Sequence, residues 1–326
     1  MVSLSRLPNF FRRFKKKRYF LGAIIGLLLG CFLFVYLPAR CAENTQHLQD
    51  VAIAPSSPDL VKGIKIGAFN MAHGRGAATS GSNWGGTAQQ RREHLQQIRK
   101  FLKQQQVDIL ILNEVDFDCS WSHRQHQAQI IAKAVYRNQV TQTNYQAALP
   151  GVRWQFGNAI LSSYEIISHQ FIDLVPQYGY EELVYGDKNV LLVEFKNTQG
   201  QRFDVIAVHL ESRDEPTRLK AAQKLIQITK QSDHPIILAG DFNSTLQDYP
   251  GHQTTPSGQS ALDLLLASQL FQPAFSNTFT PTFPNNAPSR QIDWILIPKH
   301  WHARSSQSIQ TNLSDHTFIS ATVGCE

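Results

Sequence analysis

The feature that most constrains the fold of this chain is a series of short, largely apolar runs separated by helix-like segments. Residues 107–112 (VDILIL) and 235–239 (PIILA) are two such runs. A run of this kind is typical of a strand that is buried on both of its faces. We therefore expect a β-sheet that is covered on both sides.

Further strands are expected at residues 64–69, 158–161, 190–195, 203–208, 292–297 and 317–323. Helices are expected at residues 89–105, 125–135 and 216–230, and the last has Pro216 at its start. Strands that alternate with helices in this way predict an α/β architecture of two packed mixed sheets flanked by helices. We expect one such domain from residue 62 to the C-terminus, at 62–326.

The N-terminal region has the pattern of a membrane anchor. Residues 1–18 carry seven Lys and Arg residues and no acid, and residues 19–37 that follow carry no charge. A transmembrane helix needs roughly 20 apolar residues, so this run just suffices. The positive-inside rule predicts that the basic arm stays in the cytoplasm and that the remainder lies across the membrane. Residues 38–61 are expected to form a linker.

A cleaved signal peptide is the alternative for this region, and the protein would then be secreted. Cleavage after Ala42 would require a small residue at the position of Arg40, so we favour an uncleaved single-pass signal anchor. The cysteines Cys31, Cys41, Cys119 and Cys325 show no spacing of a disulfide framework or zinc site. A Cys119–Cys325 disulfide and free thiols both remain open.

The charge of the chain argues against the binding of long nucleic acids. The formal net charge is +6, but outside residues 1–18 the chain has 24 basic and 25 acidic residues. A protein that grips nucleic acid through its phosphates is expected to carry a basic excess on the binding domain. The chain beyond residue 18 has none.

Acid, amide and imidazole side chains repeatedly follow the expected strands, where ligand sites of α/β sheets usually lie. They are Asn70, Asn113 with Glu114, His209, Asp241 with Asn243, Asp293, and Asp315 with His316. A carboxylate at the end of a buried strand, such as Glu114, suits Mg²⁺. The alternative is an acid that caps the next helix.

The segment at 240–243 (GDFN) places an acid and an amide two residues apart after a glycine that permits a tight turn. Asp241 is suited to orient a water molecule and Asn243 to stabilise developing charge. A turn in which both side chains bond their own backbone is the alternative. His316 with Asp293 would supply a general base and the carboxylate that orients it.

In this order, and together with residues 157–162 (GNAILS), these segments resemble the endonuclease/exonuclease/phosphatase superfamily of deoxyribonuclease I-like phosphoesterases. The resemblance runs from about residue 62 to the C-terminus, and its most specific motifs are GDFN at 240–243 and SDH at 314–316. It implies a four-layer α/β sandwich with the site at one edge of the two sheets.

The resemblance also implies roles for individual residues. Glu114 would bind Mg²⁺ or Mn²⁺, with Asn70 nearby and Asp315 completing the metal or phosphate shell. His316, oriented by Asp293, would act as the general base. No Ser or Cys nucleophile is evident, so in-line attack by water is expected.

The remaining roles concern water and phosphate. Asp241 would position the attacking water, and Asn243 and His209 would contact the phosphate. Asn158, in the GNAILS segment, is a candidate for substrate binding. Arg75 follows Asn70 closely and is a second candidate, although a solvated arginine is the alternative.

Two departures from the superfamily bear on the substrate. Asn113 stands where Gln is frequent before the glutamate, and Val115-Asp116 stands where nucleases often have Val-Arg. The acids Asp116 and Asp118 would repel a nucleic-acid backbone. Together with the near-neutral domain and the expected anchor, they favour a phosphodiesterase that acts on a lipid head group or small phosphodiester.

Two alternatives to that function remain: a membrane-held or secreted nuclease, and a catalytically silent domain that binds a partner at the membrane. Trp84 and Trp121 are candidates for an exposed rim that touches a membrane or substrate, with packing inside loops as the alternative. The sequence leaves the natural substrate, the number of metals and the oligomeric state open.

Overall fold

The structure is a computed structural model, and it describes residues 19–27, 29–30, 44–47, 57–77, 81–133, 135–174, 189–253, 258–275 and 278–325.

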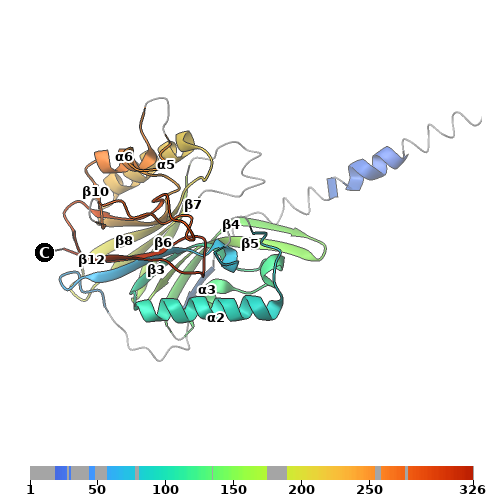
Figure 1. Ribbon diagram of the computed structural model, residues 1–326, viewed down its shortest axis with the longest axis horizontal. Coiled ribbons are helices and arrows are strands. Elements are labelled where there is room, and N and C mark those ends of the chain that lie inside the picture. The colour runs from blue at the N-terminus through green and yellow to red at the C-terminus, as the bar shows by residue number, and fades with distance from the viewer. Residues whose placement is uncertain are drawn as a thin grey trace, which may run out of the picture.

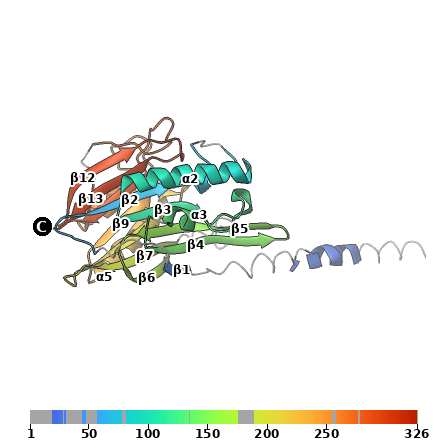
Figure 2. The ribbon, with the colours of Figure 1, turned by 90° about the horizontal axis from the view of Figure 1, so that it is seen from below.

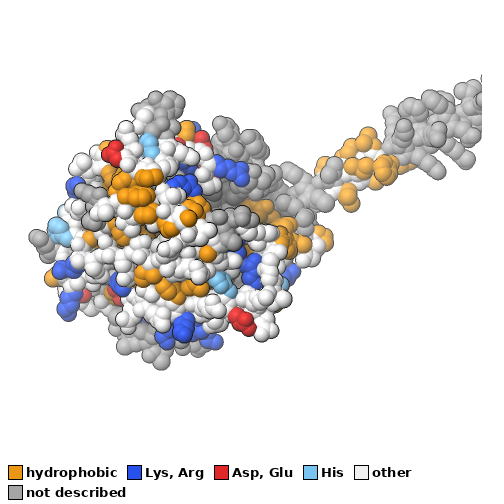
Figure 3. Space-filling model, in the orientation of Figure 1, with side chains coloured by type: hydrophobic (Ala, Val, Ile, Leu, Met, Phe, Trp, Pro, Cys, Tyr) orange, Lys and Arg blue, Asp and Glu red, His pale blue; other side chains and the backbone are white. Residues whose placement is uncertain are grey.

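The basic arm expected at 1–18 lies outside the described residues. The transmembrane helix expected at 19–37 is described in part, and residues 19–27 and 29–30 are helical. Their large apolar side chains, such as Tyr19, Phe20 and Leu27, are exposed (Figure 3). In the part of the chain that the structure describes, no helix has both the length and the apolar character needed to cross a membrane.

Two mixed β-sheets pack against each other (Figures 1 and 2). The seven-stranded sheet has the order β1 (Asn44–His47), β4 (Asn138–Leu149), β5 (Val152–Ser162), β3 (Ile109–Asp116), β2 (Ile64–Asn70), β13 (Phe318–Gly324) and β12 (His302–Ile309). The six-stranded sheet has the order β10 (Phe271–Pro273), β11 (Asp293–Pro298), β9 (Ile236–Asp241), β8 (Arg202–His209), β7 (Asn189–Lys196) and β6 (Ile166–Asp173). Each sheet has one parallel pair, β2–β3 and β8–β9, and its other pairs are antiparallel.

Helices cover the outer faces of both sheets (Figure 1). Helices α2 (Ala88–Gln105) and α3 (Gln127–Ala132) cover the seven-stranded sheet, and α5 (Glu215–Gln231) and α6 (Ala261–Ala267) cover the other. The chain passes through α2 between β2 and β3, and through α5 between β8 and β9, as parallel pairs require. The turns η1 (Ala72–Gly74) and η2 (Ser120–Ser122) follow β2 and β3.

Local signals explain where the long helices begin. The Thr87 hydroxyl accepts a hydrogen bond from the Gln90 backbone N–H, and the Gln90 side chain reciprocates in a capping box at the start of α2. Asp214 caps α5 by accepting a hydrogen bond from the Thr217 N–H, with Pro216 in the first turn. These devices satisfy backbone donors that would otherwise lack partners.

The apolar core lies in three layers, which explains the continuous apolar runs. Within β3, Ile109 and Ile111 pack between the sheets, whereas Leu110 and Leu112 pack beneath α2 and α3. Successive residues of a strand point to opposite faces, so a strand buried on both sides must be apolar throughout. The expected sandwich of two packed mixed sheets with flanking helices is confirmed.

The elements that the sequence did not predict are mostly at or beside sheet edges. They are β1, β4, β6, β10, β12 and α6. Strand β12 is largely exposed, so its polar sequence lacks the apolar pattern of a buried strand. Strand β1 falls within the segment 38–61 that was expected to be a linker. Cys119 and Cys325 are free thiols, whereas Cys31 and Cys41 lie outside the described residues.

Candidate active site

Strand register brings the predicted site residues into two facing rows. In the six-stranded sheet, Asp241 pairs directly with His209 on one side and with Asp293 on the other. In the seven-stranded sheet, Asn70 pairs with Asn113. Asn70, His209 and Asp241 are the last residues of their strands, Asp293 is the first residue of β11, and Asn113 lies in the second half of β3, so the rows meet at one edge of the sandwich.

A β-bulge directs Glu114 into this edge. The register between β3 and β5 shifts between Leu112 and Val115, and Glu114 has a positive φ of 51°. A bulge bends its strand and re-aims the side chains of the extra residue. Glu114 therefore faces the opposing sheet, although it lies within a strand whose neighbours are buried in the core.

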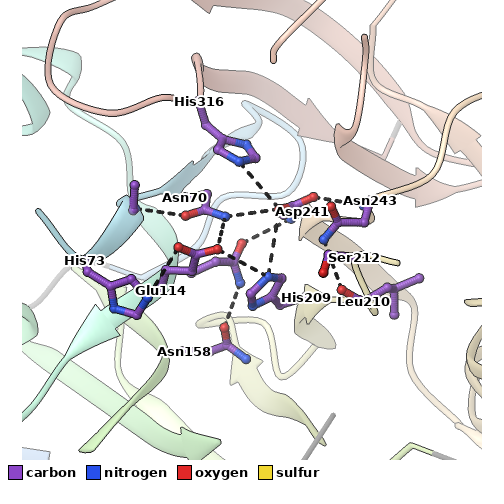
Figure 4. Close-up of polar contacts among 12 residues, drawn as sticks. Asn70, His73, Glu114, Asn158, His209, Leu210, Ser212, Asp241, Asn243 and His316 are labelled. Atoms are coloured by element: carbon purple, nitrogen blue, oxygen red, sulfur yellow. Dashed lines mark hydrogen bonds and ion pairs between the residues drawn. The ribbon is translucent and has the colours of Figure 1, made fainter. Parts of the chain in front are cut away.

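Two asparagines join the sheets at the site (Figure 4). The Asn70 amide donates hydrogen bonds to Glu114 Oε1 at 3.2 Å and to Asp241 Oδ2 at 3.1 Å. Asn113 Oδ1 accepts a hydrogen bond from the Asp241 backbone N–H at 3.1 Å. The carboxylates of Glu114 and Asp241 are thereby held near each other by neutral donors.

Gly240 makes the approach of the sheets possible. Its φ is +134°, and a Cβ atom at this position would lie 2.1 Å from the Val208 carbonyl oxygen and 2.8 Å from Asn113 Oδ1. Neither contact is tolerable, and the backbone conformation itself favours glycine. The glycine of the GDFN segment thus determines how closely β9 packs against β8 and Asn113.

We expect the substitution Gly240→Ala to lower the free energy of unfolding by about 3 kcal/mol, the sum of a strained φ and an overpacked contact. Gly200→Ala is the matched control, since Gly200 also has a positive φ (84°) but nothing within 4 Å of its added Cβ. It should cost about 1 kcal/mol. Urea denaturation followed by circular dichroism measures both, and equal losses would show that the close approach at Gly240 is not needed.

His316 and Asp293 form an oriented pair. His316 Nδ1 lies 2.9 Å and 3.1 Å from the two Asp293 carboxylate oxygens, so this nitrogen carries a proton and donates it. The other ring nitrogen, Nε2, lies 3.8 Å from Asp241 Oδ2. The Ser314 hydroxyl donates to the Asn70 carbonyl oxygen at 2.6 Å and accepts from the His316 backbone N–H. The SDH segment is thereby tied to the end of β2.

His209 and Asn243 complete the face formed by the six-stranded sheet. His209 Nε2 lies 3.8 Å from Glu114 Oε1 and 3.9 Å from Asp241 Oδ2. The Asn243 side-chain amide donates to the Leu210 carbonyl oxygen, and its backbone N–H donates to Asp241 Oδ1. The GDFN segment is therefore a self-bonded turn, and it also presents Asp241 Oδ2 to the site.

The remaining predicted residues lie around this centre. Asn158 is fully buried, accepts a hydrogen bond from Asn113 at its Oδ1, and has no partner for its Nδ2 among the described residues. Arg75 is not a solvated side chain: its Nη2 forms an ion pair with Asp315 Oδ2 at 2.5 Å. The second oxygen of Asp315 is buried and has no hydrogen-bond partner in the described part of the chain.

A sequence profile of the Endonuclease/Exonuclease/phosphatase family matches residues 67–316, which include every residue of this site. This chain belongs to the endonuclease/exonuclease/phosphatase family. The family consists of metal-dependent phosphoesterases, so the chain is a metal-dependent phosphoric ester hydrolase.

Solved structures share the family fold at low sequence identity. An endonuclease/exonuclease/phosphatase from Bacteroides vulgatus is 16% identical with a TM-score of 0.59, and the match covers 81% of this chain and 99% of that one. A mannosyl-6-phosphatase of Bacteroides thetaiotaomicron is 15% identical with a TM-score of 0.58, over 80% and 99% of the chains. The catalytic domain of human Nocturnin, with bound sulfate, is 16% identical with a TM-score of 0.55, over 86% and 96%. No curated protein sequence matches the chain significantly.

The donor set of this family member fits a divalent cation. Carboxylate oxygens suit hard cations such as Mg²⁺. Glu114 supplies one, and the buried, unpartnered Oδ1 of Asp315 supplies another. Burial raises the pKa of Asp315 and the nearby charge of Glu114 adds to the rise, against His316 and Arg75. A cation between the two acids would relieve their mutual repulsion.

Asp241, Asp293 and His316 form a second group of metal-binding atoms, within 4.8 Å of one another. Both Asp293 oxygens contact His316 Nδ1, however. We therefore regard this group as a histidine–carboxylate pair with a neighbouring acid. The carboxylate of Asp241 lies between this pair and the Glu114 side of the site, so it can interact with His316 or with a cation.

The surroundings of the site shift the pKa values of Glu114 and Asp241 in opposite directions. Burial alone would raise the pKa of Glu114, but His73, His209 and His316 outweigh it and lower this pKa to about 2. Burial raises the pKa of Asp241 to about 7, with Asp293 adding to the effect. Glu114 is therefore fully ionised at neutral pH, whereas Asp241 can exchange a proton there.

His316 has the opposite environment. Burial opposes its charge, but the carboxylates of Asp293 and Asp241 outweigh burial and raise the pKa of His316 to about 10. The ring is accordingly protonated at neutral pH. It presents an Nε2–H donor beside Asp241.

His73 is a site residue that the sequence did not single out. Its Nε2 lies 3.5 Å from Glu114 Oε2, and its Nδ1 lies 2.7 Å from Asp116 Oδ1. The sequence shows His73 three residues after Asn70, but a single histidine in a loop does not by itself indicate a site residue. Its significance depends on Asp116, which is 43 positions away.

The acids after Glu114 are paired within the protein, so they do not present the free charge on which the argument against a nucleic-acid backbone relied. Asp116 is fully buried and accepts hydrogen bonds from His73 and, at 2.8 Å, from Trp121 Nε1. Asp118 forms an ion pair with Arg153 at 3.0 Å. Trp121 therefore packs within the loops, whereas Trp84 is 57% exposed.

Proposed function

We propose that the chain is a phosphodiesterase that acts on a lipid head group or another small phosphodiester, with Mg²⁺ or Mn²⁺ as cofactor. The observation that carries this proposal is the convergence of Asn70, Glu114, His209, Asp241 and His316 within hydrogen-bond or ion-pair range. Three groups of this site suit the hydrolysis of a phosphate ester. They are the protonated imidazole of His316, the carboxyl of Asp241 with a pKa near neutrality, and the ionised carboxylate of Glu114 as a metal ligand.

The proposed mechanism is in-line attack of water on phosphorus, in which a new P–O bond forms as the P–O bond to the alcohol breaks, and the departing alkoxide takes up a proton from solvent. A cation held by Glu114 and Asp315 would polarise a phosphoryl oxygen and neutralise its charge. Asp241 Oδ2 accepts the proton of the attacking water, because its pKa lies near neutrality. His316 donates its Nε2–H to the phosphate and is held in place by Asp293. The resemblance implied His316 as the base; we propose Asp241 instead, because the carboxylates around His316 raise the pKa of that ring to about 10.

Neutral donors complete the proposed binding of the phosphate. The unpartnered Nδ2 of Asn158 and the ring of His209 border the same centre. Asn243 holds the turn that presents Asp241. Arg75 acts through Asp315, whose charge it balances.

A small or lipid substrate is favoured by charge and by the proposed location. Outside residues 1–18 the chain has no basic excess. A mannosyl-6-phosphatase among the structural neighbours shows that the fold accommodates a small phosphate ester. We propose that residues 1–37 anchor the chain in a membrane, because seven cations precede an uncharged run of 19 residues. The catalytic domain would lie on the extracytoplasmic side.

The test is a substrate panel with the full-length chain in detergent micelles. Phospholipid, sphingomyelin, a small soluble phosphodiester, a sugar phosphate and plasmid DNA are each incubated with Mg²⁺, with Mn²⁺ and with chelator. We expect hydrolysis of a lipid or small phosphodiester that chelator abolishes and added Mg²⁺ restores. Nicking of plasmid with no turnover of the other substrates would overturn the proposal in favour of a nuclease. Hydrolysis of none of them, with no binding of Mg²⁺, would favour a silent binding domain.

A further inference from the structure

His73 lies between two carboxylates. Its Nδ1 is 2.7 Å from Asp116 Oδ1, and its Nε2 is 3.5 Å from Glu114 Oε2. A carboxylate oxygen accepts hydrogen bonds, so Nδ1 donates to Asp116 and Nε2 faces Glu114 within ion-pair range. The ring is therefore directed at Glu114 by Asp116, as Figure 4 shows for its Glu114 side.

The surroundings of His73 hold this arrangement rigidly. Trp121 Nε1 donates to the second oxygen of Asp116 at 2.8 Å. The Gln127 side chain accepts from the Asp116 backbone N–H and donates to the His73 carbonyl oxygen. The His73 ring also packs edge-on against Trp121 and Phe156, at centroid distances of 5.4 Å and 4.9 Å.

The backbone at this position is strained. His73 has a φ of 55°, and the preceding Ala72 has a φ of 46°. Left-handed conformations are unfavourable for non-glycine residues and persist where the surroundings impose them. Strain at a residue that contacts a proposed metal ligand indicates that the position of the ring is specified by function.

The contact restricts what Glu114 can offer a cation. Its Oε2 faces His73 Nε2 at 3.5 Å, whereas its Oε1 accepts a hydrogen bond from Asn70 and lies 3.8 Å from His209 Nε2 at the centre of the site. A cation at that centre would therefore meet Oε1 and not Oε2. Mg²⁺ requires a compact shell of about six ligands, whereas Ca²⁺ takes about six to eight and often binds a carboxylate through both oxygens.

We propose that His73, positioned by Asp116, restricts Glu114 to binding a cation through one oxygen and thereby favours Mg²⁺ over Ca²⁺. The inference rests on the proposed binding of a cation at Glu114. His73 is a positioning residue in this proposal, since it acts through Glu114. Groups that orient metal ligands in this way alter metal affinity by roughly 10- to 100-fold when they are removed.

The test compares two amide substitutions of His73 in the full-length chain. In His73→Asn the amide nitrogen replaces Nδ1, so the contact with Asp116 is kept and the contact with Glu114 is lost. In His73→Gln the amide nitrogen takes the place of Nε2, so the donor to Glu114 is kept. Isothermal titration calorimetry gives the Kd for Mg²⁺ and the Kd for Ca²⁺ of each variant, with no substrate present.

We expect His73→Asn to lower the ratio of the Ca²⁺ Kd to the Mg²⁺ Kd roughly 10-fold. His73→Gln should keep the ratio of the unmodified chain. A loss of folded protein scales both constants alike, so the ratio reports the contact with Glu114 and not the stability. His234→Asn is the control, because His234 lies beside Asp204 at 3.7 Å in the same kind of pair but away from the site.

The outcomes separate this inference from the proposed function. If Mg²⁺ binds and His73→Asn keeps the original ratio, His73 does not select the cation, although the metal site stands. An equal fall in His73→Gln or in His234→Asn would likewise overturn the role of the donor to Glu114. If the unmodified chain binds neither cation, the proposed metal site itself fails.

Discussion

Replacement of His316 by alanine is expected to lower kcat/KM by roughly 10³- to 10⁴-fold, or about 4 to 5.5 kcal/mol of transition-state stabilisation. His316 is buried, is fixed by two contacts with Asp293, and directs its other nitrogen at the site. In the proposed mechanism its loss removes both the charged donor to the phosphate and the group that faces Asp241, the proposed proton acceptor. No other described side chain occupies the same place, since His209 lies on the Glu114 side of Asp241.

The measurement is a steady-state assay on the substrate that the panel identifies, with thermal unfolding of each variant recorded in parallel. His300→Ala is the matched control, because His300 is exposed at the end of β11 and should leave the rate unchanged. A His316→Ala variant that is folded and retains more than a tenth of the activity would mean that this histidine is outside the chemistry. The same variant separates genuine hydrolysis from a contaminating enzyme.

The substitution Arg218→Ala is expected to lower the free energy of unfolding by about 3–5 kcal/mol, the usual cost of breaking a buried ion pair by removing one partner. Arg218 is 1% exposed and forms an ion pair with Glu215 at 2.6 Å. It also donates to the Glu211 carbonyl oxygen and to the Gln253 side chain, each at 2.6 Å. Alanine would leave the Glu215 carboxylate buried without its cation.

The same substitution should reach the active site through Glu215. The Oε1 atom of Glu215 accepts hydrogen bonds from the Ser244 hydroxyl at 2.8 Å and from the Ala261 N–H at 2.7 Å. Ser244 follows Asn243 directly, so the pair supports the turn that presents Asp241. We expect activity to fall together with stability.

Urea denaturation compares Arg218→Ala with Arg202→Ala. Arg202 also pairs with a glutamate, Glu194, at 2.5 Å, but its side chain is 43% exposed. An exposed pair contributes at most about 1 kcal/mol. If both variants lose the same stability, burial does not govern the contribution of Arg218, and the network around Glu215 is dispensable.

The proximity of several candidate residues could be predicted from sequence where they adjoin apolar strands. Glu114 and Asp241 come at the end of an apolar run, His316 comes just before the apolar strand β13, and strand ends of a sheet meet at one edge. The structure brings all three together with Asn70 and His209. The order of the motifs along the chain indicated the family, and the family implies metal-dependent hydrolysis of phosphate esters.

Prediction failed where a residue's meaning depends on a distant partner. Asp116 was interpreted as an exposed charge, yet it is fully buried against His73 and Trp121. Arg75 was considered a phosphate-binding or a solvated side chain, and its ion pair with Asp315, 240 positions away, could not be predicted. Sequence spacing contains no information about such pairs, because the folded chain forms them through loops of unrelated length.

The sequence by itself determined that this protein has two sheets flanked by helices, and it determined which polar residues are available for catalysis. Strands buried on both faces must be apolar throughout, so β3 and β9 were visible without coordinates, whereas the exposed edge strand β12 was not. Only the tertiary structure decided how these polar residues are arranged around the site. The bulge at Glu114, the close approach at Gly240 and the His73–Asp116 pair depend on contacts between the two sheets and their loops, which no local pattern encodes.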